Sequence, residues 1–424
     1  MVLPARVSAL VATLVLLLGA CSSSTTSAPA PQSTTGGPAS APASSPAAST
    51  SATAPVSPAP TSAAPTSAAP FAVTASLADG AQVPVDHRFV ATVTGGTVEN
   101  VVVTSTDPRP EKKALPGGVS ADKSTWQAAA LLEPGVSYTA AISARSADGQ
   151  AVAKTVKFST TPLSLKQQVF VYNIIGAGQT VGVAMPVVVS FDMPIADKAS
   201  FQRAMQVTSV PAQNGSWRWV SDKEAHWRPE SYWQTGTTVD VNIAVNGVSA
   251  GNGLYGQESK RASFTVGRAA QITVDLQAHT ATQTVNGQTT KVIPVTGGKE
   301  GFETRSGTKV IMERLDSVDM NAGSTGTAQD SPEFYDLKGV KYAMRVTQSG
   351  EFFHAAPWSV GSQGKTNVSH GCVGMSDENA DWLMTNSLVG DPVLYTGSSR
   401  PLEDGNGWTD WNISFAEFKK GSAL

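Results

Sequence analysis

Beyond residue 70, short runs with an apolar residue at every second position constrain the fold more than any other feature. In the clearest run, Val239, Val241, Ile243 and Val245 alternate with Asp, Asn and Ala. A period of two places such side chains on one face of a β-strand. The chain also has 38 Gly and 26 Pro and only 15% charged residues, a balance that favours short strands and turns over long helices. The sequence therefore predicts a mainly β fold.

Two β modules are predicted in the first two thirds of the chain. Residues 71–162 resemble a small immunoglobulin-like β-sandwich, and residues 163–268 resemble a second one with a short helix near 196–205. The apolar positions that indicate strands in the first module are Phe89, Ala91, Val93, Val101, Val102, Val103, Val156 and Phe158.

An aromatic cluster lies in the second module, at Trp217, Trp219, Trp227, Tyr232 and Trp233. Aromatic faces stack on sugars, so a glycan-binding surface is one interpretation. The favoured interpretation is packing, because rings of this size fill the core of a small β module or bury against the next domain.

The N-terminal 20 residues are typical of an export signal. Arg6 precedes an apolar run over residues 7–18 that is too short to span a membrane but suits a secretory signal. The run ends in Leu-Gly-Ala before Cys21, as in lipoprotein signals, so we expect cleavage before Cys21 and lipidation of that residue. An ordinary signal peptide cut near Ala20 is the alternative.

Residues 21–70 are almost entirely Ser, Thr, Ala, Pro and Gly. Such a segment has no apolar face to bury, so we expect a disordered stalk. The folded part is then expected at the outer face of the cell membrane, held by lipid chains that contribute about 0.8 kcal/mol per buried methylene.

Charge and cysteine content narrow the function. The formal net charge of −3 excludes the basic footprint of a nucleic-acid-binding protein. A disulfide between the two cysteines, Cys21 and Cys372, would tie the leader to the far end of the chain. Cys372 is therefore either a reactive thiol or a buried, inert one.

Cys372 and its neighbouring histidines lack the paired spacing of a zinc site, and residues 251–253 lack the carboxylates that calcium needs. No metal or other cofactor is predicted.

The stretch from His354 to Ser376 contains the elements of nucleophilic catalysis. A cysteine nucleophile needs a nearby base and donors for the oxyanion it creates. His370 precedes Cys372 by two positions, and Gly371 allows the loop to direct several N–H groups at one point. Ser376 is a predicted N-cap for a helix that should end near residues 390–392, and its N-terminus should favour a thiolate at Cys372.

This stretch resembles the L,D-transpeptidases, whose catalytic domain is also called YkuD. The family motif is a histidine on a strand, followed about 18 residues later by Ser-His-Gly-Cys. Here His354 precedes Cys372 by 18 positions (372 − 354), within Ser369–Cys372. The flanks also resemble the family, at Ala355, Ala356, Pro357, Trp358, Thr366, Asn367, Gly298, Lys299, Thr304 and Gly307. Together with the lipoprotein signal, stalk and β modules, the likeness is to the mycobacterial and related actinobacterial branch.

The resemblance implies a cysteine acyltransferase of peptidoglycan. Cys372 would attack a tetrapeptide stem and release D-alanine, and the amine of a second stem would complete a 3→3 cross-link. His354 would be the base, oriented by the Ala355 carbonyl, while the N–H groups of His370, Gly371 and Cys372 would hold the oxyanion. A structural role for the His370 side chain is favoured over a second base. Carbapenem β-lactams would be covalent inhibitors.

The resemblance also implies substrate contacts. Tyr335 corresponds to a lid tyrosine, and Gly374 stands where relatives often have Asn, which leaves substrate affinity open. Core packing is an equal alternative for Met312 and Trp358. The full expected set is Tyr335, Ser349, Gly350, Met312, Trp358, Asn367, Ser369 and Gly374.

The catalytic domain is expected at residues 269–396, with an aromatic tail at 397–424 folding back over it and the preceding module. Two other functions stay open. An L,D-carboxypeptidase would resolve the same acyl-enzyme with water, and a non-catalytic scaffold would bind the wall.

Overall fold

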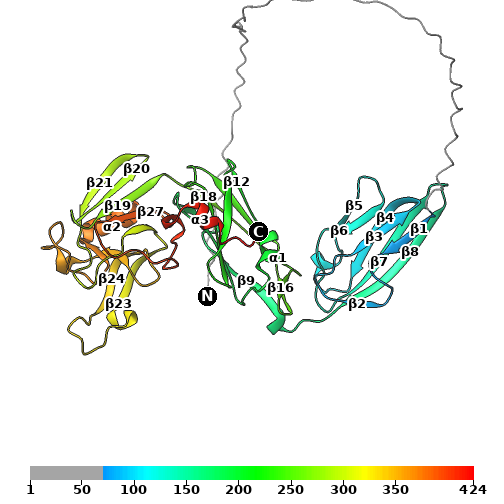
Figure 1. Cartoon of the computed structure of the whole chain (residues 1–424), viewed down its shortest axis with the longest axis horizontal. Coiled ribbons are helices and arrows are strands. Elements are labelled where there is room, and N and C mark those ends of the chain that lie inside the picture. Colours follow the sequence, from blue (N-terminus) through cyan, green and yellow to red (C-terminus); the bar gives the residue numbers. More distant parts are fainter. Residues whose placement is uncertain (1–69) are drawn as a thin grey trace, which may run out of the picture. The chain divides into compact units, whose positions relative to one another are not determined.

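The computed structural model describes residues 70–424 (Figure 1). The predicted signal peptide, Cys21 and almost all of the predicted stalk lie outside the described residues. Strands dominate and helices are short, which confirms the predicted mainly β fold. Within residues 70–424, no helix is long and apolar enough to cross a membrane.

The first module is a sandwich of two four-stranded sheets, with strand orders β1-β3-β6-β5 and β2-β8-β7-β4. Alternation decides what is buried: on β4, Val101 and Val103 face the core, whereas Val102 is 47% exposed. Phe89, Phe158 and Tyr138 stack at the centre of the core. The elements are β1 (Ala72–Ala75), β2 (Ala81–Val83), β3 (Val90–Thr94), β4 (Gly96–Ser105), η1 (Pro110–Lys112), β5 (Gly117–Val119), β6 (Thr125–Ala128), β7 (Ser137–Ser146) and β8 (Ala151–Thr160).

The second module is also built from two sheets, in the orders β10-β18-β15-β12 and β13-β14-β11-β9-β17-β16. On β15, Val239, Val241 and Ile243 are fully buried, as their alternation predicts. The elements are η2 (Leu165–Gln167), β9 (Gln168–Ile174), β10 (Thr180–Val181), β11 (Val187–Phe191), α1 (Lys198–Arg203), β12 (Met205–Val210), β13 (Gly215–Trp219), β14 (Glu224–Pro229), β15 (Thr238–Ile243), β16 (Ser249–Gly251), β17 (Leu254–Gln257) and β18 (Lys260–Val266).

The tryptophans of the aromatic cluster belong to this core. Trp217, Trp219, Trp227 and Trp233 are all buried, and Trp227 stacks on Trp233. The indole N–H groups of Trp217, Trp219 and Trp233 find partners inside the module, as in the bond from Trp233 Nε1 to the Met185 carbonyl at 2.7 Å. The structure thus favours packing over glycan binding for these four rings.

The catalytic domain has two sheets, in the orders β21-β20-β19-β27-β22 and β23-β24-β25-β26 (Figure 1). Helix α2 packs on β24 and β25. The elements are β19 (Ala270–Asp275), β20 (Thr280–Val285), β21 (Gln288–Pro294), β22 (Gly307–Val310), β23 (Glu313–Asn321), η3 (Ala322–Thr325), β24 (Asp336–Arg345), β25 (Phe352–Ala355), η4 (Pro357–Ser359), β26 (Val373–Met375), α2 (Asp377–Thr385) and β27 (Pro392–Thr396).

The C-terminal tail, with η5 (Asp410–Asn412) and α3 (Phe415–Lys419), contacts both the second module and the catalytic domain. Trp411 Nε1 donates to the Ala184 carbonyl at 2.7 Å, and the Thr308 N–H donates to Asn412 Oδ1 at 3.1 Å. The guanidinium of Arg228 lies 4.4 Å from the ring centroid of Trp411. The tail therefore fastens β14 of one domain to β22 of the other.

Candidate active site

Two parallel strands bring His354 and Cys372 together. β25 and β26 pair with Phe353 opposite Val373 and His354 opposite Gly374. Because side chains alternate along a strand, Phe353 and Val373 pack in the main core of the domain. Phe352 and Cys372 share a separate cluster on the opposite face. His354 and Cys372 line the same pocket there.

His354 is set up as a base. Its Nδ1 donates to the Ala355 carbonyl at 2.8 Å, so Nε2 carries the free lone pair in the neutral ring. Burial lowers the pKa of His354, and the Ala355 carbonyl only partly opposes this effect. The imidazole is therefore neutral at neutral pH and can accept a proton.

Cys372 is a neutral thiol in the resting site. Burial raises its pKa to about 12, although the backbone N–H of Phe352 favours the anion. The Sγ–H donates to the Gly350 carbonyl, with the sulfur 3.5 Å from that oxygen. The proton must therefore leave the sulfur during attack.

The prediction that a helix N-terminus stabilises a thiolate at Cys372 is wrong. Ser376 does cap α2, by accepting from the Asn379 N–H at 3.3 Å. However, β26 separates Cys372 from the start of the helix at Asp377, on the order of 10 Å at about 3.3 Å per strand residue. The helix also ends at Thr385, earlier than predicted. Asn386 is the C-cap, and its side-chain Nδ2 donates to the Trp382 carbonyl at 2.8 Å.

The catalytic loop is held by its own side chains. Gly371 has a φ of 123°, a conformation that glycine tolerates. Its N–H donates to Ser369 Oγ at 3.1 Å, and Ser369 Oγ donates to the Cys372 carbonyl at 2.6 Å. Thr304 Oγ1 donates to the Gly371 carbonyl at 2.8 Å. In this structure the Gly371 amide and the Ser369 hydroxyl therefore stabilise the loop, while Ser369 also lines the pocket of Cys372 and His354.

The His370 side chain ties the catalytic loop to Glu333. Its Nε2 lies 2.7 Å from Glu333 Oε2, and Lys299 Nζ lies 2.5 Å from the same carboxylate oxygen. Its ring also packs edge-on against Phe302 and in a tilted arrangement against Tyr335. The bond to Glu333 and the ring contacts therefore hold the loop in place, as the favoured structural role of His370 requires.

Cys372 borders pockets of contrasting chemistry. One, of about 240 Å³, is mostly apolar, and its lining includes Tyr335, His354, Trp358, Met320 and Leu337. Another, of about 420 Å³, is polar, and its lining includes Tyr335, Ser349, Gly350, Arg305, Glu351 and Arg400. Of the expected substrate contacts, Tyr335, Ser349, Gly350 and Trp358 are therefore beside the nucleophile. Trp358 is 58% exposed, so its core-packing alternative is wrong.

Three expected substrate contacts face elsewhere. Met312 packs against the core of the second module. The Asn367 amide is used by the scaffold: its Oδ1 accepts from the Gly297 N–H at 2.8 Å, and its Nδ2 donates to the Leu276 carbonyl at 2.9 Å. Gly374 is buried, and a Cβ there would lie 2.9 Å from Ala356 Cβ.

Several residues at the site escape the sequence analysis. Glu333 holds His370, while Arg305, Lys309 and Glu351 form an ion-pair cluster beside Cys372. Lys309 interrupts an otherwise apolar strand end, which is the one local signal of a special role. Its pairing with a residue 42 positions later has no sequence signature.

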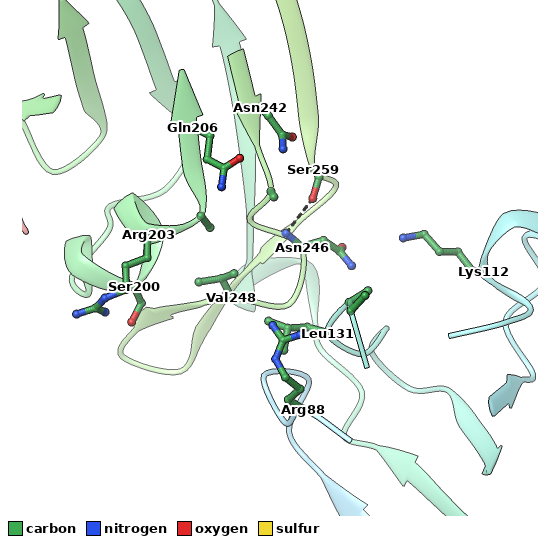
Figure 2. Close-up of a pocket in the computed structure, with 14 residues that line it drawn as sticks. Arg88, Lys112, Leu131, Ser200, Arg203, Gln206, Asn242, Asn246, Val248 and Ser259 are labelled. Carbon is green, nitrogen blue, oxygen red and sulfur yellow. Dashed lines mark hydrogen bonds between the residues drawn. The ribbon is translucent and has the colours of Figure 1, made fainter. Parts of the chain in front are cut away.

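Other candidate sites in residues 70–424 are chemically sparse. No group of three or more His, Cys, Asp or Glu in this part of the chain is arranged to hold a metal ion. A larger pocket of about 480 Å³ has Gln206, Asn242, Asn246 and Ser259 in its lining (Figure 2). Its lining contains no cysteine, histidine or carboxylate. The pocket shared by Cys372 and His354, by contrast, brings a thiol and an imidazole together.

Comparisons with known proteins point to the same domain. Residues 269–394 match the model of the L,D-transpeptidase catalytic domain, and residues 80–249 match that of a bacterial Ig domain. L,D-transpeptidase 2 of Mycobacterium tuberculosis (strain CDC 1551 / Oshkosh) is 34% identical over 355 residues, covering 83% of this chain and 85% of the relative. L,D-transpeptidase 5 of M. tuberculosis (strain ATCC 25618 / H37Rv) is 34% identical over 322 residues, covering 74% of this chain and 69% of the relative. A solved L,D-transpeptidase in complex with imipenem is 34% identical, with a TM-score of 0.47, and covers 53% of this chain and 98% of its own.

Proposed function

Because this chain belongs to the L,D-transpeptidase family, we propose that it forms 3→3 cross-links between peptidoglycan stem peptides through an acyl-enzyme on Cys372. It is an acyltransferase. The observation that supports this mechanism is the shared pocket of Cys372 and His354, in which the Ala355 carbonyl holds the base in its useful tautomer.

The first half-reaction forms a thioester. Cys372 Sγ attacks the carbonyl of the third residue of a tetrapeptide stem while His354 Nε2 takes the thiol proton. The tetrahedral intermediate then collapses, the peptide bond to the terminal D-alanine breaks, and the leaving amine takes the proton from His354. In the second half-reaction, the side-chain amine of an acceptor stem attacks the thioester. His354 takes a proton from that amine and returns it to the sulfur.

Backbone amides stabilise the oxyanion in this mechanism. Since the Gly371 N–H is directed at Ser369 Oγ, we assign the donor role to the N–H groups of His370 and Cys372. Loss of one such donor costs about 10²- to 10³-fold in rate in related acyl transfers. Gly371 contributes by its conformation.

The substrate path runs on both sides of Tyr335, which lines the apolar and the polar pocket. We propose that Trp358 and Tyr335 cover the bound stem, with Ser349 and Gly350 along its backbone. Carbapenems would acylate the same sulfur, a proposal supported by the relative solved with imipenem.

We also propose that the mature chain is anchored to the outer face of the cell membrane through lipid on Cys21. The support is the sequence alone: a short apolar run, small residues before the cysteine, and a polar stalk of about 50 residues. Metabolic labelling with a fatty-acid analogue should mark the wild type, and Cys21→Ala should abolish the label. A retained label in the variant would contradict the anchor.

Product analysis tests the proposed reaction. The enzyme is incubated with a disaccharide-tetrapeptide, and the products are separated and identified by mass spectrometry. Dimers linked through two diaminopimelate residues are the expected product, with loss of D-alanine. Tripeptide monomers alone would identify a carboxypeptidase. The absence of any D-alanine release, while Cys372 is intact, would favour the scaffold alternative.

A further inference from the structure

Three charged side chains are buried together beside the nucleophile. Lys309 Nζ lies 2.5 Å from Glu351 Oε2, and Arg305 Nη1 lies 3.0 Å from Glu351 Oε1. The side chains of Lys309, Glu351 and Arg305 are 0%, 6% and 12% exposed. We refer to these three residues as the charge cluster. Lys309 Nζ also lies 3.6 Å from the ring centroid of Tyr395, so water does not reach the ammonium from that side.

Glu351 belongs to the backbone turn that contacts the Cys372 sulfur. Its two chain neighbours supply those contacts: the Gly350 carbonyl accepts from Sγ, and the Phe352 N–H favours the thiolate. The Glu351 N–H donates to Thr347 Oγ1 at 2.9 Å, which closes the turn. A shift of Glu351 would therefore move both groups that contact the sulfur.

The Glu351 carboxylate also supports the catalytic loop. It lies on the side of Gly371 that a side chain would occupy, because a Cβ there would be 3.6 Å from Oε1. The same oxygen accepts from the Arg305 N–H at 3.1 Å. Arg305 directly follows Thr304, whose hydroxyl bonds the Gly371 carbonyl. Glu351 thus connects the turn, the segment at residues 304–305 and the nucleophile loop.

Stability alone does not account for such a cluster. Removing three charges from water is costly, and replacing a buried ion pair by apolar residues of similar size is often neutral or stabilising. Strongly paired buried charges in a cleft beside a nucleophile are instead candidates for functional groups. Glu351 faces two cations here, but Arg305 Nε also lies 2.5 Å from Glu403 Oε2. The charge of Arg305 is therefore shared between two carboxylates, whereas the buried ammonium of Lys309 is paired with Glu351.

The other charged and titratable groups around Cys372 include Arg400, which lines the polar pocket and, like Arg305, is paired with Glu403. On the strand side, Arg345 favours the thiolate and Glu351 opposes it. Tyr335 and Tyr395 are neutral, because burial raises the pKa of each phenol. On the loop side, His370 is paired with Glu333, and His354 is neutral. Lys309 is therefore the buried cation whose loss would most change the charge balance.

We propose that Lys309, Arg305 and Glu351 are positioning residues that hold the Gly350–Phe352 backbone against Cys372, and that the positive charge of buried Lys309 helps the thiol to lose its proton. This inference rests on Cys372 being the nucleophile of the proposed function. In support, burial lowers the pKa of Lys309 to about 8, with Glu351 opposing that effect. The ammonium is therefore retained at neutral pH because of its partner.

Alkylation of Cys372 by the uncharged reagent iodoacetamide tests the proposal without any substrate. The rate is measured on the full chain at pH 7 by mass spectrometry of the peptide containing Cys372, which separates it from Cys21. Lys309→Met leaves Glu351 with Arg305 alone, so it should slow alkylation about tenfold, the effect of one pKa unit. In the double variant with Glu351→Gln, removal of the carboxylate that opposes the thiolate should make alkylation faster than in Lys309→Met.

A faster rate in the double variant separates the proposal from a purely structural role. If the cluster only supported the fold, the second substitution would disturb the site further and slow alkylation again. The proposal is wrong if Lys309→Met alkylates as fast as the wild type, or if the double variant is as slow as Lys309→Met or slower. Arg305→Gln, closer to the surface, should also slow alkylation. It takes the place of Lys309→Met if Lys309→Met does not fold. Arg261→Gln removes an exposed cation far from the site and should change nothing. Carbapenem acylation is scored separately, so an inactive enzyme with the predicted alkylation pattern would contradict only the proposed function.

Discussion

Cys372 and His354 are both uncharged at neutral pH, because burial raises the pKa of the thiol and lowers that of the imidazole. Enzymes with a preformed thiolate instead hold the cysteine beside a cation or a helix N-terminus. In the proposed mechanism the proton therefore moves to His354 Nε2 as the sulfur attacks the substrate carbonyl.

The neutral pair predicts the pH dependence of Cys372 alkylation. With a thiol pKa of about 12, the thiolate fraction should rise about tenfold per pH unit across the neutral and alkaline range. Rates of iodoacetamide labelling from pH 6 to pH 10 should therefore increase without a plateau. A rate that is already constant between pH 6 and pH 8 would indicate a preformed thiolate and would contradict the account.

Single residues also show where sequence reasoning works and where it ends. Cys372, His354 and the Ala355 carbonyl could be placed because a short motif with fixed spacing determines their geometry. Asn367 and Gly374 are in that motif too, yet their neighbours come from distant segments at residues 276, 297 and 356. Glu351 and Lys309 could not be paired, since Lys309 lies on β22 and Glu351 lies in the turn before β25. Segments so far apart in the sequence meet only through the fold.

At the scale of elements, the two β modules use the same packing device. In each, a glycine begins an edge strand and a tryptophan ring from the next strand occupies the space of its missing side chain. A Cβ at Gly117 would lie 2.1 Å from the Trp126 ring, and a Cβ at Gly215 would lie 2.2 Å from the Trp227 ring. Alternation in the sequence predicts the strands, but it does not predict this contact across them.

The glycine contact can be tested within one strand. Gly117→Ala should displace the Trp126 ring and lower the free energy of unfolding of the first module by about 1–3 kcal/mol, the usual cost of overpacking. Gly118→Ala is the matched control, because a Cβ there has no atom within 4 Å. Urea denaturation followed by tryptophan fluorescence measures both. Equal stability of the two variants would refute the contact.

Helix α2 shows why element boundaries are hard to predict. Gly390 and Pro392 suggested the end of the helix, but Asn386 ends it earlier. Residues 387–391 then form a turn in which Asp391 Oδ2 accepts from the Leu388 N–H at 2.8 Å. A hydrogen bond from a side chain to the backbone competes with the next turn of the helix. Several nearby polar residues could form such a bond, so the sequence does not show where the helix ends.

At the scale of the whole molecule, a buried histidine connects the second module to the tail. His226 Nδ1 lies 2.9 Å from Asp410 Oδ1, and Nε2 lies 3.1 Å from Glu224 Oε1. Burial alone would lower the pKa of His226, but the two carboxylates outweigh it and raise the pKa to about 9. The sequence of the tail predicts aromatic packing but does not indicate the contact between Asp410 and His226.

The sign of the resulting stability effect follows from linkage. The folded pKa of His226 is above its unfolded value of about 6.5, so its contribution is complete below pH 6.5 and disappears as the pH rises through about 9. The difference in unfolding free energy between wild type and His226→Gln should therefore shrink from pH 6 to pH 10. A difference that stays constant over this range would contradict the contact.

The central claim is that Cys372 is the nucleophile, and intact-protein mass spectrometry with a carbapenem tests it most directly. The wild-type chain should gain the mass of one carbapenem, located on the peptide containing Cys372. Cys372→Ala should gain none while keeping the same circular dichroism spectrum. An unmodified wild type, under conditions that label a known L,D-transpeptidase, or an adduct on folded Cys372→Ala would contradict the account.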